Sequence, residues 1–479
     1  MSDVPAARGG RAELLVLTAL ALLTRFWGLS YPPVVVWDEV HFERYAAAYF
    51  TGRYYVDVHP PLGKLLFAAA AKLLGVSSAT LAAAEPAPAL RLLPALAGAL
   101  VIPVVFLLLR ELGAGRRVAT LGAALLLVDN ALLVESRFIL MDGMLVLFGM
   151  TAVLCYVMAR GRHGATRWWW LLACGITAGM AAGTKWTGLS ALGLVLLAWG
   201  SDAVFRRPAA AVFMKEGLLL LFAPLAVYVG AFVVHFALLH RSGPGDSWMS
   251  QQFQATLEGN LLYRSGAAES FARSFFHLNR VMAGINIGWA TDTNVGASPW
   301  YTWPIAKHAM GLWSPTAPGE EPVRWIILLA NPVVWWGALI GIAVFAVAAL
   351  DKRRRAGLAG HRSAMLLLAA GYALNFLPFA FIKRPMYLYH YLLALIFSVM
   401  LAALGVGALA GWTESDPDSR GAWRFPSRRS LALYALVLGL AAATFGYLAP
   451  MSYGWPLSAR AVMHRRMLLE RHPGVSEDR

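Results

Sequence analysis

The feature that most constrains this chain is a series of apolar runs, each about as long as a lipid bilayer is thick. A helix needs roughly 20 mostly apolar residues to cross the hydrocarbon core of a membrane. Eleven runs in the sequence approach or exceed that length. They lie at 12–29, 89–109, 118–134, 138–159, 168–184, 186–205, 216–238, 325–350, 363–381, 388–411 and 430–449. We therefore predict an all-α integral membrane protein, a single polytopic domain over 1–479 with about eleven transmembrane helices.

The composition supports the same class. Hydrophobic residues make up 59% of the chain and charged residues 14%, whereas soluble domains carry about 25% charged residues. The first run follows Arg8 and Arg11 but lacks the small-residue cleavage pattern of a secretory signal, so we expect an uncleaved span. Both cysteines, Cys155 and Cys174, lie inside apolar runs, which excludes a disulfide framework.

The distribution of basic residues orients the spans. With the N-terminus in the cytoplasm, every strongly basic short loop falls on the cytoplasmic side, as the positive-inside rule requires. These loops hold Arg110, Arg116, Arg117, Arg160, Arg162, Arg167, Arg206, Arg207, Lys215, Lys352 to Arg355, Arg362 and, in the predicted cytoplasmic loop 412–429, Arg420 to Arg429. The net charge of +15 is thereby explained by topology and anionic lipid. We expect a multi-pass protein of the cell (plasma) membrane that contacts membrane lipids and no nucleic acid.

Two long segments then face the outside of the cell, at 30–88 and 241–324. Both mix aromatic residues, glycine and proline with charges, which is typical of folded caps more than of disordered linkers. Within the first segment, residues 62–74 form a candidate amphipathic helix that would lie along the membrane surface.

The first outer segment carries a dense cluster of ionisable residues: Asp38, Glu39, His41, Asp57 and His59. The adjacent carboxylates lie where a span emerges, and partial desolvation there would raise a carboxylate pKa and suit it to act as a base. A solvated pair of loop acids is the plain alternative. The histidines and aspartates could also form a metal site, but their spacing lacks a tight ligand pattern, so we predict neither metal nor cofactor.

A second set of residues is cationic and lies at the outer ends of spans, against the positive-inside trend. It comprises Arg91, Arg137, Lys185, Lys383 and Arg384. Cations at this depth need an anionic partner, and a lipid phosphate supplies one. The alternative is snorkelling of long side chains to the interface.

Several further residues near these cations are candidates for substrate contact. Asp142 begins the span after Arg137, and Tyr389 and His390 follow Arg384. Trp300 and Trp303 belong to an aromatic group in the second outer segment, which would either form an interfacial belt or stack on a sugar or acceptor peptide. The predicted substrate-contacting set is His41, Asp57, His59, Asp142, Trp300, Trp303, Tyr389 and His390.

The acidic and cationic sets together are sufficient for one reaction. Displacement of a phosphate from the anomeric carbon of a sugar needs cations to absorb the developing negative charge. The attacking hydroxyl needs one positioned base, and attack from the opposite face inverts the anomeric centre. The sequence contains no P-loop, which a phosphoryl-transfer enzyme of that class would require.

The same residues lie in motifs that resemble those of the protein O-mannosyltransferase family. The matching segments are DEVHF at 38–42, DVHPPLGK at 57–64, SRFILMD at 136–142, KWTGL at 185–189, PWYTWP at 299–304 and YHYL at 389–392. The first two are highly specific, and the set runs in order over most of the chain.

The resemblance implies a C-type glycosyltransferase (GT-C) fold with its site under the first outer segment. It also implies polyprenyl- or dolichyl-phosphate-mannose as donor and Ser/Thr hydroxyls of a polypeptide as acceptors, with the secretion machinery as a conceivable further partner. Asp38 then corresponds to the general base, Glu39 to a positioning neighbour, and Arg91, Arg137 and Lys185 to phosphate contacts. Lys383 and Arg384 are additions made from the charge pattern.

One departure from the family concerns the second outer segment. Eukaryotic members insert a β-trefoil domain there, and about 85 residues are too few for such a module. We therefore expect a compact, bacterial type. A transferase of another lipid-linked sugar is the nearest alternative function. A transporter is more distant, because it predicts charges in mid-span and an inverted repeat.

Overall fold

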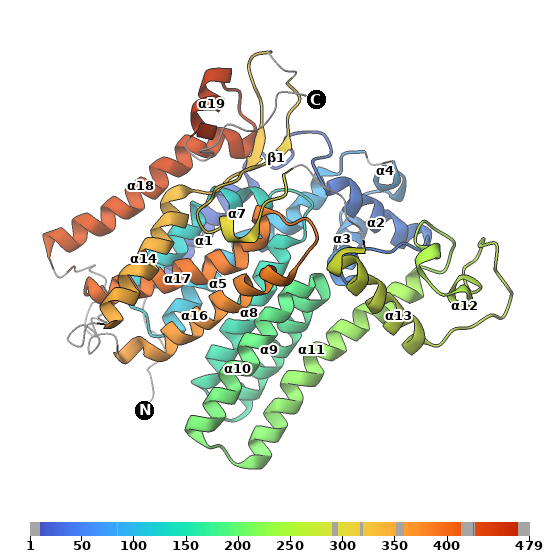
Figure 1. The fold of residues 1–479 in the computed structure, drawn as a ribbon, viewed down its shortest axis with the longest axis horizontal. Coiled ribbons are helices and arrows are strands. Elements are labelled where there is room, and N and C mark those ends of the chain that lie inside the picture. The colour runs from blue at the N-terminus through green and yellow to red at the C-terminus, as the bar shows by residue number, and fades with distance from the viewer. Residues whose placement is uncertain are drawn as a thin grey trace.

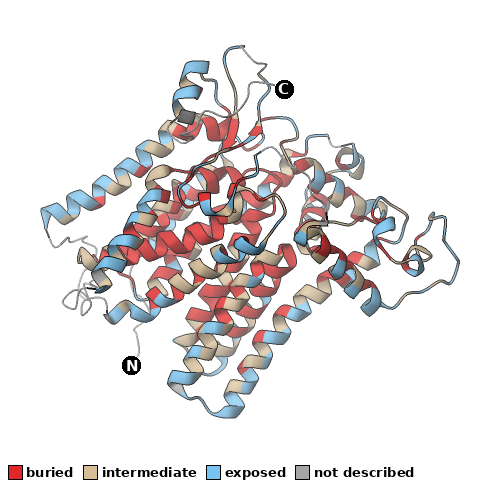
Figure 2. Ribbon diagram, viewed as in Figure 1, coloured by how far each residue is buried: buried red, intermediate tan, exposed pale blue. Residues whose placement is uncertain are grey.

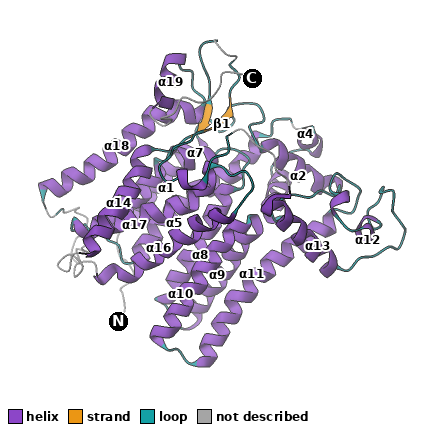
Figure 3. Ribbon diagram, in the orientation of Figure 1, coloured by secondary structure: helices purple, strands orange, loops and turns teal. Residues whose placement is uncertain are grey.

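The computed structural model describes residues 10–83, 85–289, 296–316, 320–350, 359–412, 425 and 427–467, and it is almost entirely helical (Figure 1, Figure 3). The α-helices and strands are α1 (Arg11–Phe26), α2 (Glu39–Thr51), α3 (Leu62–Leu73), α4 (Ser78–Ala82), α5 (Leu92–Glu111), α6 (Arg116–Leu127), α7 (Asn130–Glu135), α8 (Asp142–Arg160), α9 (Gly164–Thr184), α10 (Leu189–Arg206), α11 (Ala210–Leu238), α12 (Gln251–Gln254), α13 (Phe271–Gly284), β1 (Met310–Trp313), β2 (Ile326–Leu328), α14 (Pro332–Leu350), α16 (Arg362–Phe376), α17 (Leu392–Leu409), α18 (Arg428–Tyr453) and α19 (Ala459–Met467).

Short helical turns join these elements. They are η1 (Pro88–Arg91), η2 (Trp186–Gly188), η3 (Asp246–Trp248), η4 (Ile285–Trp289), η5 (Trp300–Thr302), η6 (Ala359–His361), η7 (Leu377–Phe381) and η8 (Leu388–Tyr391). Several of them extend a membrane helix at its outer end, so that η1 leads into α5, η2 into α10 and η8 into α17.

Each predicted span contains at least one helix, with two corrections to the expected boundaries. Within the described residues, seven helices are long and apolar enough to cross a membrane, and Pro332–Val347 is a shorter apolar helix. The predicted spans 12–29, 118–134 and 168–184 hold α1, α6 with α7, and α9, so the count of eleven stays a prediction. The run 325–350 begins as strand β2 instead of helix, and the run 118–134 is broken in two.

The break between α6 and α7 has a polar cause. The Asp129 carboxylate accepts the backbone N–H of Leu132 at 2.8 Å and so caps the start of α7. Arg25 donates to the carbonyl oxygens of Leu127 (3.0 Å) and Leu126 (3.5 Å), which are unpaired at the end of α6. The chain can therefore turn at mid-run and carry residues 135–142 back to the start of α8.

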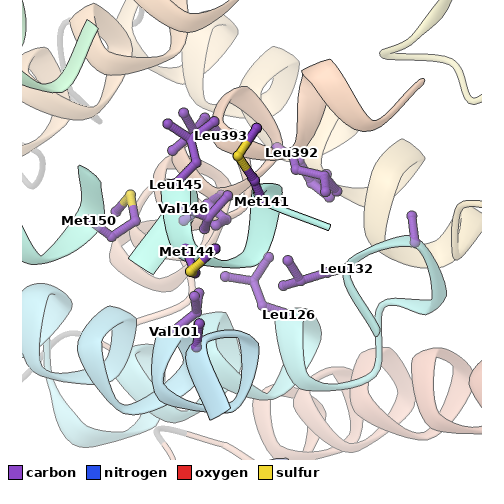
Figure 4. Close-up of a cluster of buried hydrophobic side chains, with 14 of the residues drawn as sticks. Val101, Leu126, Leu132, Met141, Met144, Leu145, Val146, Met150, Leu392 and Leu393 are labelled. Carbon is purple, nitrogen blue, oxygen red and sulfur yellow. The ribbon is translucent and has the colours of Figure 1, made fainter. Parts of the chain in front are cut away.

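The membrane helices form a buried central group and an exposed peripheral group (Figure 2). The apolar windows of α17 and α8 are 83% and 78% buried, whereas those of α11 and α18 are 22% and 17% buried. The first pair therefore makes the protein core and the second pair presents its side chains to lipid. Figure 4 shows part of the core, where Val101, Leu126, Leu132, Met144 and Leu392 meet from five different elements.

The two outer segments fold as caps at one end of the bundle (Figure 1). The first holds α2, α3 and α4. The predicted helix at 62–74 is present as α3, but its Phe67 and Lys64 side chains are buried in protein, so the expected position along the membrane surface applies at most to its exposed end at Leu73. The second holds α12 and α13 and strand β1, which pairs antiparallel with β2 through Met310 and Leu328. The predicted cytoplasmic loop 412–429 lies largely outside the described residues.

Candidate active site

Asp38 lies at the N-cap of α2 with a carboxylate that makes no capping hydrogen bond. The preceding residue, Trp37, has a left-handed backbone with φ of 49°, which is strained for a bulky side chain. The Trp37 ring meets Tyr387 edge to face, with centroids 6.3 Å apart. The half-buried Asp38 carboxylate is thus held by its backbone and remains available to a substrate.

Burial raises the pKa of the Asp38 carboxyl group, and the positive charges of His41 and Lys185 oppose that effect. The carboxylates of Asp142 and Asp57 add to the upward shift. The structure therefore brings five of the predicted site residues into one electrostatic neighbourhood, and His41 is exposed at its edge. A raised pKa makes the Asp38 carboxylate a stronger base, which suits it to accept a proton.

Glu39, the neighbour of Asp38, is fully engaged inside the protein. Its carboxylate forms a two-point ion pair with Arg91, whose Nε and one terminal nitrogen each donate at 2.8 Å. It also accepts the backbone N–H groups of Val36 (2.8 Å) and Ile139 (2.9 Å). With 1% exposure, Glu39 ties α2 to η1 and to the 136–142 turn and has no oxygen left for a substrate.

Arg91 donates all five of its N–H groups within the chain. Besides Glu39, it binds the carbonyl oxygens of Leu29 (3.3 Å), Pro32 (2.9 Å) and Val34 (2.8 Å). A guanidinium has five donors, so none remains for a ligand. The structure does not support the predicted phosphate contact for Arg91, because the side chain closes the turn that leads to Asp38.

Arg137 has a similar role at the end of α1. It donates to the carbonyl oxygens of Arg25 (2.9 Å), Trp27 (2.7 Å) and Gly28 (3.0 Å), and its guanidinium carbon lies 4.5 Å from the centroid of the Tyr453 ring. At 2% exposure it is enclosed by the chain. The carbonyl oxygens at the end of α1 are the partners of its terminal nitrogens, whereas its buried Nε has no partner in the described chain. Because the side chain is enclosed, the structure gives the predicted phosphate contact of Arg137 no support.

Lys185, by contrast, faces the site. It forms an ion pair with Asp142, and its ammonium group lies 5.1 Å from the centroid of the Tyr389 ring. An ammonium has three N–H donors, and one of them is used by Asp142. Lys185 therefore keeps donors for an anion while Asp142 holds it in place.

Glu135 extends this pair and was not predicted as a site residue. Its carboxyl group is a close neighbour of that of Asp142, and Glu135 is 2% exposed with one oxygen unpaired. Burial, followed by the Asp142 carboxylate, raises the pKa of Glu135 well above its ordinary value. Burial and the neighbouring Asp142 carboxylate thus favour the protonated form of Glu135, and Asp142 in turn holds Lys185. Its position at the predicted hairpin was visible in the sequence, but its partner was not.

Asp57, His59 and Lys64 lie together and line a second, small cavity. Lys64, which was not predicted as a site residue, donates to the Asp57 carboxylate at 2.5 Å and to the carbonyl oxygen of His59 at 2.5 Å. Burial lowers the pKa of His59 well below its ordinary value, and the charges of Lys185, Arg384 and Lys64 lower it further. His59 is therefore neutral and able to hydrogen-bond a hydroxyl group.

The outer end of α17 contributes the remaining cations. A terminal nitrogen of Arg384 lies 3.4 Å from Nε2 of His390, and its Nε is a buried donor without a hydrogen-bond partner in the described chain. Lys383 is exposed beside it. The structure therefore places Arg384 at the site and Lys383 at its rim.

The two predicted tryptophans differ in access. Trp303 is 0% exposed, stacks on His390 with centroids 6.0 Å apart, and donates from Nε1 to Ser298 at 2.9 Å. Both its ring and its N–H are occupied, so the predicted stacking of Trp303 on a substrate is not supported. Trp300 is half-buried against Phe376, with centroids 4.9 Å apart, and keeps part of its surface free.

A groove of about 310 Å³ opens from this site into the membrane region. Asp142, Tyr389 and His390 line one part of it, and apolar side chains of α8, α10, α16 and α17, among them Leu145 and Leu374, line the rest. The groove therefore has a polar part beside Lys185 and an apolar part at the depth of acyl chains. No group of three or more His, Cys, Asp or Glu residues suited to a metal ion occurs among residues with assigned positions.

The raised pKa of Glu135 gives a testable prediction. Glu135→Gln should transfer within about threefold of the wild-type rate at neutral pH, because an amide keeps the donor that Asp142 needs. In the wild type, ionisation of Glu135 at alkaline pH adds a negative charge beside Asp142 and Asp38 and slows the reaction, and the variant lacks that group. We expect the alkaline fall in rate to be shallower in the variant. A pH–rate profile measures this, and identical alkaline limbs would contradict it.

Comparisons with known proteins bear on the chain as a whole. Residues 15–240 match the family described as dolichyl-phosphate-mannose-protein mannosyltransferase, and residues 271–471 match the C-terminal four-helix membrane region of protein-O-mannosyltransferase. Protein O-mannosyl-transferase 1 of Danio rerio is 35% identical over 266 residues, which cover 52% of this chain and 37% of that protein. Protein O-mannosyltransferase 1 of Drosophila melanogaster is 37% identical over 267 residues, covering 51% and 30%. The chain thus matches about a third of the length of these relatives.

Solved structures confirm the fold class. The S. cerevisiae protein O-mannosyltransferase Pmt1–Pmt2 complex bound to the sugar donor superposes with a TM-score of 0.84 at 18% identity, covering 97% of this chain and 92% of that chain. The oligosaccharyltransferase AglB of Archaeoglobus fulgidus gives a TM-score of 0.55 at 14% identity, covering 97% and 60%. At these identities the likeness concerns the fold alone, which is the predicted C-type glycosyltransferase fold.

Proposed function

Because this chain belongs to the protein O-mannosyltransferase family, we propose that it transfers mannose from polyprenyl- or dolichyl-phosphate-mannose to Ser/Thr hydroxyls of proteins. The transfer takes place at the outer face of the cell membrane, with inversion of the anomeric carbon. The observation that carries the proposal is that Asp38, half-buried and without a capping hydrogen bond, lies within the electrostatic influence of Lys185, which pairs with Asp142 at the polar end of an apolar groove.

In the proposed reaction, Asp38 accepts the proton of the acceptor hydroxyl as its oxygen attacks the anomeric carbon. The bond between that carbon and the phosphate oxygen breaks, and the polyprenyl phosphate leaves with the bonding electron pair. Lys185 and the free Nε donor of Arg384 meet the growing negative charge on the phosphate. Lys383, exposed at the rim, adds positive charge for the arriving donor.

The groove would accommodate the lipid chain of the donor. Its apolar lining by Leu145, Leu374 and Leu393 suits an isoprenoid chain, and its polar end at Asp142 and Tyr389 lies where the phosphate and sugar would begin. A carrier seated this way enters laterally from the bilayer, so membrane lipid and the donor share one path.

The remaining predicted residues contact the sugar and the acceptor. Neutral His59, His390 and the Asp57 carboxylate offer hydrogen-bonding groups on two sides of the site. His41 and Trp300 retain exposed surface toward the outside, where an unfolded acceptor segment would arrive. Delivery of that segment by the secretion machinery fits this orientation. Glu39, Arg91 and Arg137 act as positioning residues that hold the turn before Asp38.

Exchange of the lipid donor tests this function. The purified protein in nanodiscs should transfer sugar to a Ser/Thr peptide from polyprenyl-phosphate-mannose, and much more slowly from a polyprenyl-phosphate carrying arabinose. Lys185→Met should lower transfer by about 10²–10³-fold, the usual loss for one removed transition-state donor. Lys215→Met, on the cytoplasmic side, is the control. Faster transfer from the arabinose donor would favour the alternative sugar specificity, and full activity of Lys185→Met would refute the phosphate contact.

A further inference from the structure

Helix α13 in the second outer segment has a surface that protein does not cover. Its N-cap is Ser270, and it buries Ser274, Leu278 and Met282 on one face. On the opposite face Phe276 is 70% exposed, and Arg280 is also exposed. An exposed aromatic side chain beside arginines on an amphipathic helix is typical of a helix that lies in a membrane interface.

The depth of α13 is fixed by its contacts with the membrane helix α11. Phe275 packs edge to face on Phe232 and Tyr228, with centroids 5.0 Å and 6.1 Å apart. These two residues precede the end of α11 at Leu238 by six and ten positions, which is about 9–15 Å at 1.5 Å per residue. Helix α13 therefore lies below the outer end of a membrane helix, and Figure 1 shows it crossing that part of α11.

Away from α13, helix α11 exposes apolar side chains at the same level. Val233 and Val234 of α11 are 48% and 45% exposed at the same level as the α13 contacts. Around α13, Phe276 follows the flank that packs on α11, and Arg273 and Arg280 come next on the far side of Phe276. Arg273 is 62% exposed although it also pairs with Glu269 at 3.4 Å and donates to Gln252 at 2.6 Å. At a bilayer surface, an apolar side chain should face the acyl chains and cations should face the lipid phosphates. The side chains of α13 follow that order.

The buried side of α13 reaches the candidate active site. Leu278 and Met282 share a small cavity with Asp57, His59 and Lys64. Just beyond the helix, Asn286 donates to the carbonyl oxygen of Val58 at 3.1 Å. The helix therefore connects its uncovered face to the loop that forms one wall of the site.

We propose that α13 is an interfacial anchor that binds the outer phospholipid leaflet through Phe276, Arg273 and Arg280, and thereby sets the height of the 57–59 loop at the membrane surface. Its partner is a bilayer surface with anionic headgroups. This inference concerns membrane contact and holds whichever sugar the protein transfers.

Site-specific fluorescence tests the proposal without an activity assay. Phe276→Cys is labelled with a thiol-reactive NBD probe in nanodiscs that hold one copy each. We expect a blue-shifted emission that is quenched by lipids carrying a nitroxide near the headgroup and little by aqueous iodide. Ala79→Cys, exposed on α4, is the control and should show the opposite behaviour. The labelled protein without substitutions reports any background from the buried Cys155 and Cys174.

Two outcomes would overturn the proposal. One is equal quenching by iodide at positions 276 and 79. The other is a probe at 276 that becomes shielded only when an acceptor peptide is added, because a polypeptide would then be the partner. The headgroup contact has its own variant: Arg273→Gln with Arg280→Gln should remove the difference in probe emission between anionic and neutral nanodiscs. An undiminished difference would contradict the role of the arginines.

Discussion

Asp38→Asn is expected to lower the rate of sugar transfer at least about a hundredfold, the usual loss when a general base is removed. The amide has the same shape as the carboxylate but cannot accept the hydroxyl proton. The carboxylate makes no capping hydrogen bond at the start of α2, so the substitution should leave the fold and donor binding unchanged. Transfer from polyprenyl-phosphate-mannose to a Ser/Thr peptide measures the effect, with thermal unfolding and donor binding measured on the same sample.

A matched control variant and a pH–rate profile test the role of Asp38 further. Glu258→Gln neutralises an acid in the second outer segment that is 55% exposed, and it should leave transfer unchanged. Because burial raises the pKa of Asp38 above 3.8, the wild-type rate should fall on acidification already at a pH above that ordinary value, as the base becomes protonated. Near-normal transfer by Asp38→Asn would remove Asp38 from the role of base.

Arg91→Met is expected to destabilise the folded protein by about 3–5 kcal/mol, the range found when one partner of a buried ion pair is removed. The variant leaves the Glu39 carboxylate buried without its cation and frees three carbonyl oxygens before Asp38. Transfer should be lost together with stability because the turn that presents Asp38 is no longer held. Thermal unfolding in detergent and the transfer rate are the two measurements.

Two companion variants separate positioning from ligand binding. Arg91→Lys should also be strongly destabilised, because an ammonium cannot reproduce the two-point contact and the three carbonyl bonds. Arg53→Met, at an exposed position in the same outer segment, should be neutral. If Arg91→Met instead kept its unfolding temperature and lost only affinity for the donor, Arg91 would be a phosphate ligand, as the sequence alone had suggested.

Hydrophobic runs predicted the helices well because their length and composition are local properties. All eleven runs hold helix. The outer location of the acidic cluster, inferred from charge counting, stays a prediction. The break at Asp129 was not predictable, because a buried capping carboxylate supplied by α7 and an arginine from α1 create it. Strand β2 was missed since Ile326–Leu328 is as apolar as the helix that follows it.

The sequence predicted which residues belong to the site better than it predicted what each of them does. The position of a cation within a membrane span shows that it needs a hydrogen-bonding or anionic partner, but it does not identify that partner. Arg91 and Arg137 donate to backbone carbonyl groups, whereas Lys185 pairs with Asp142 beside an open groove. Trp303 belongs to the aromatic group that the sequence marks, yet only packing against His390 shows that its ring is covered. Glu135 gains its role from a contact with Asp142 across the 136–141 turn.

The central claim is that Asp38 acts as the base for mannose transfer at the outer membrane face. Right-side-out vesicles carrying polyprenyl-phosphate-mannose, incubated with a membrane-impermeant Ser/Thr peptide, test side and chemistry together. The account predicts mannosylated peptide with the wild type, none above background with Asp38→Asn, and none in sealed inside-out vesicles. Product formed only in the inside-out vesicles would contradict it.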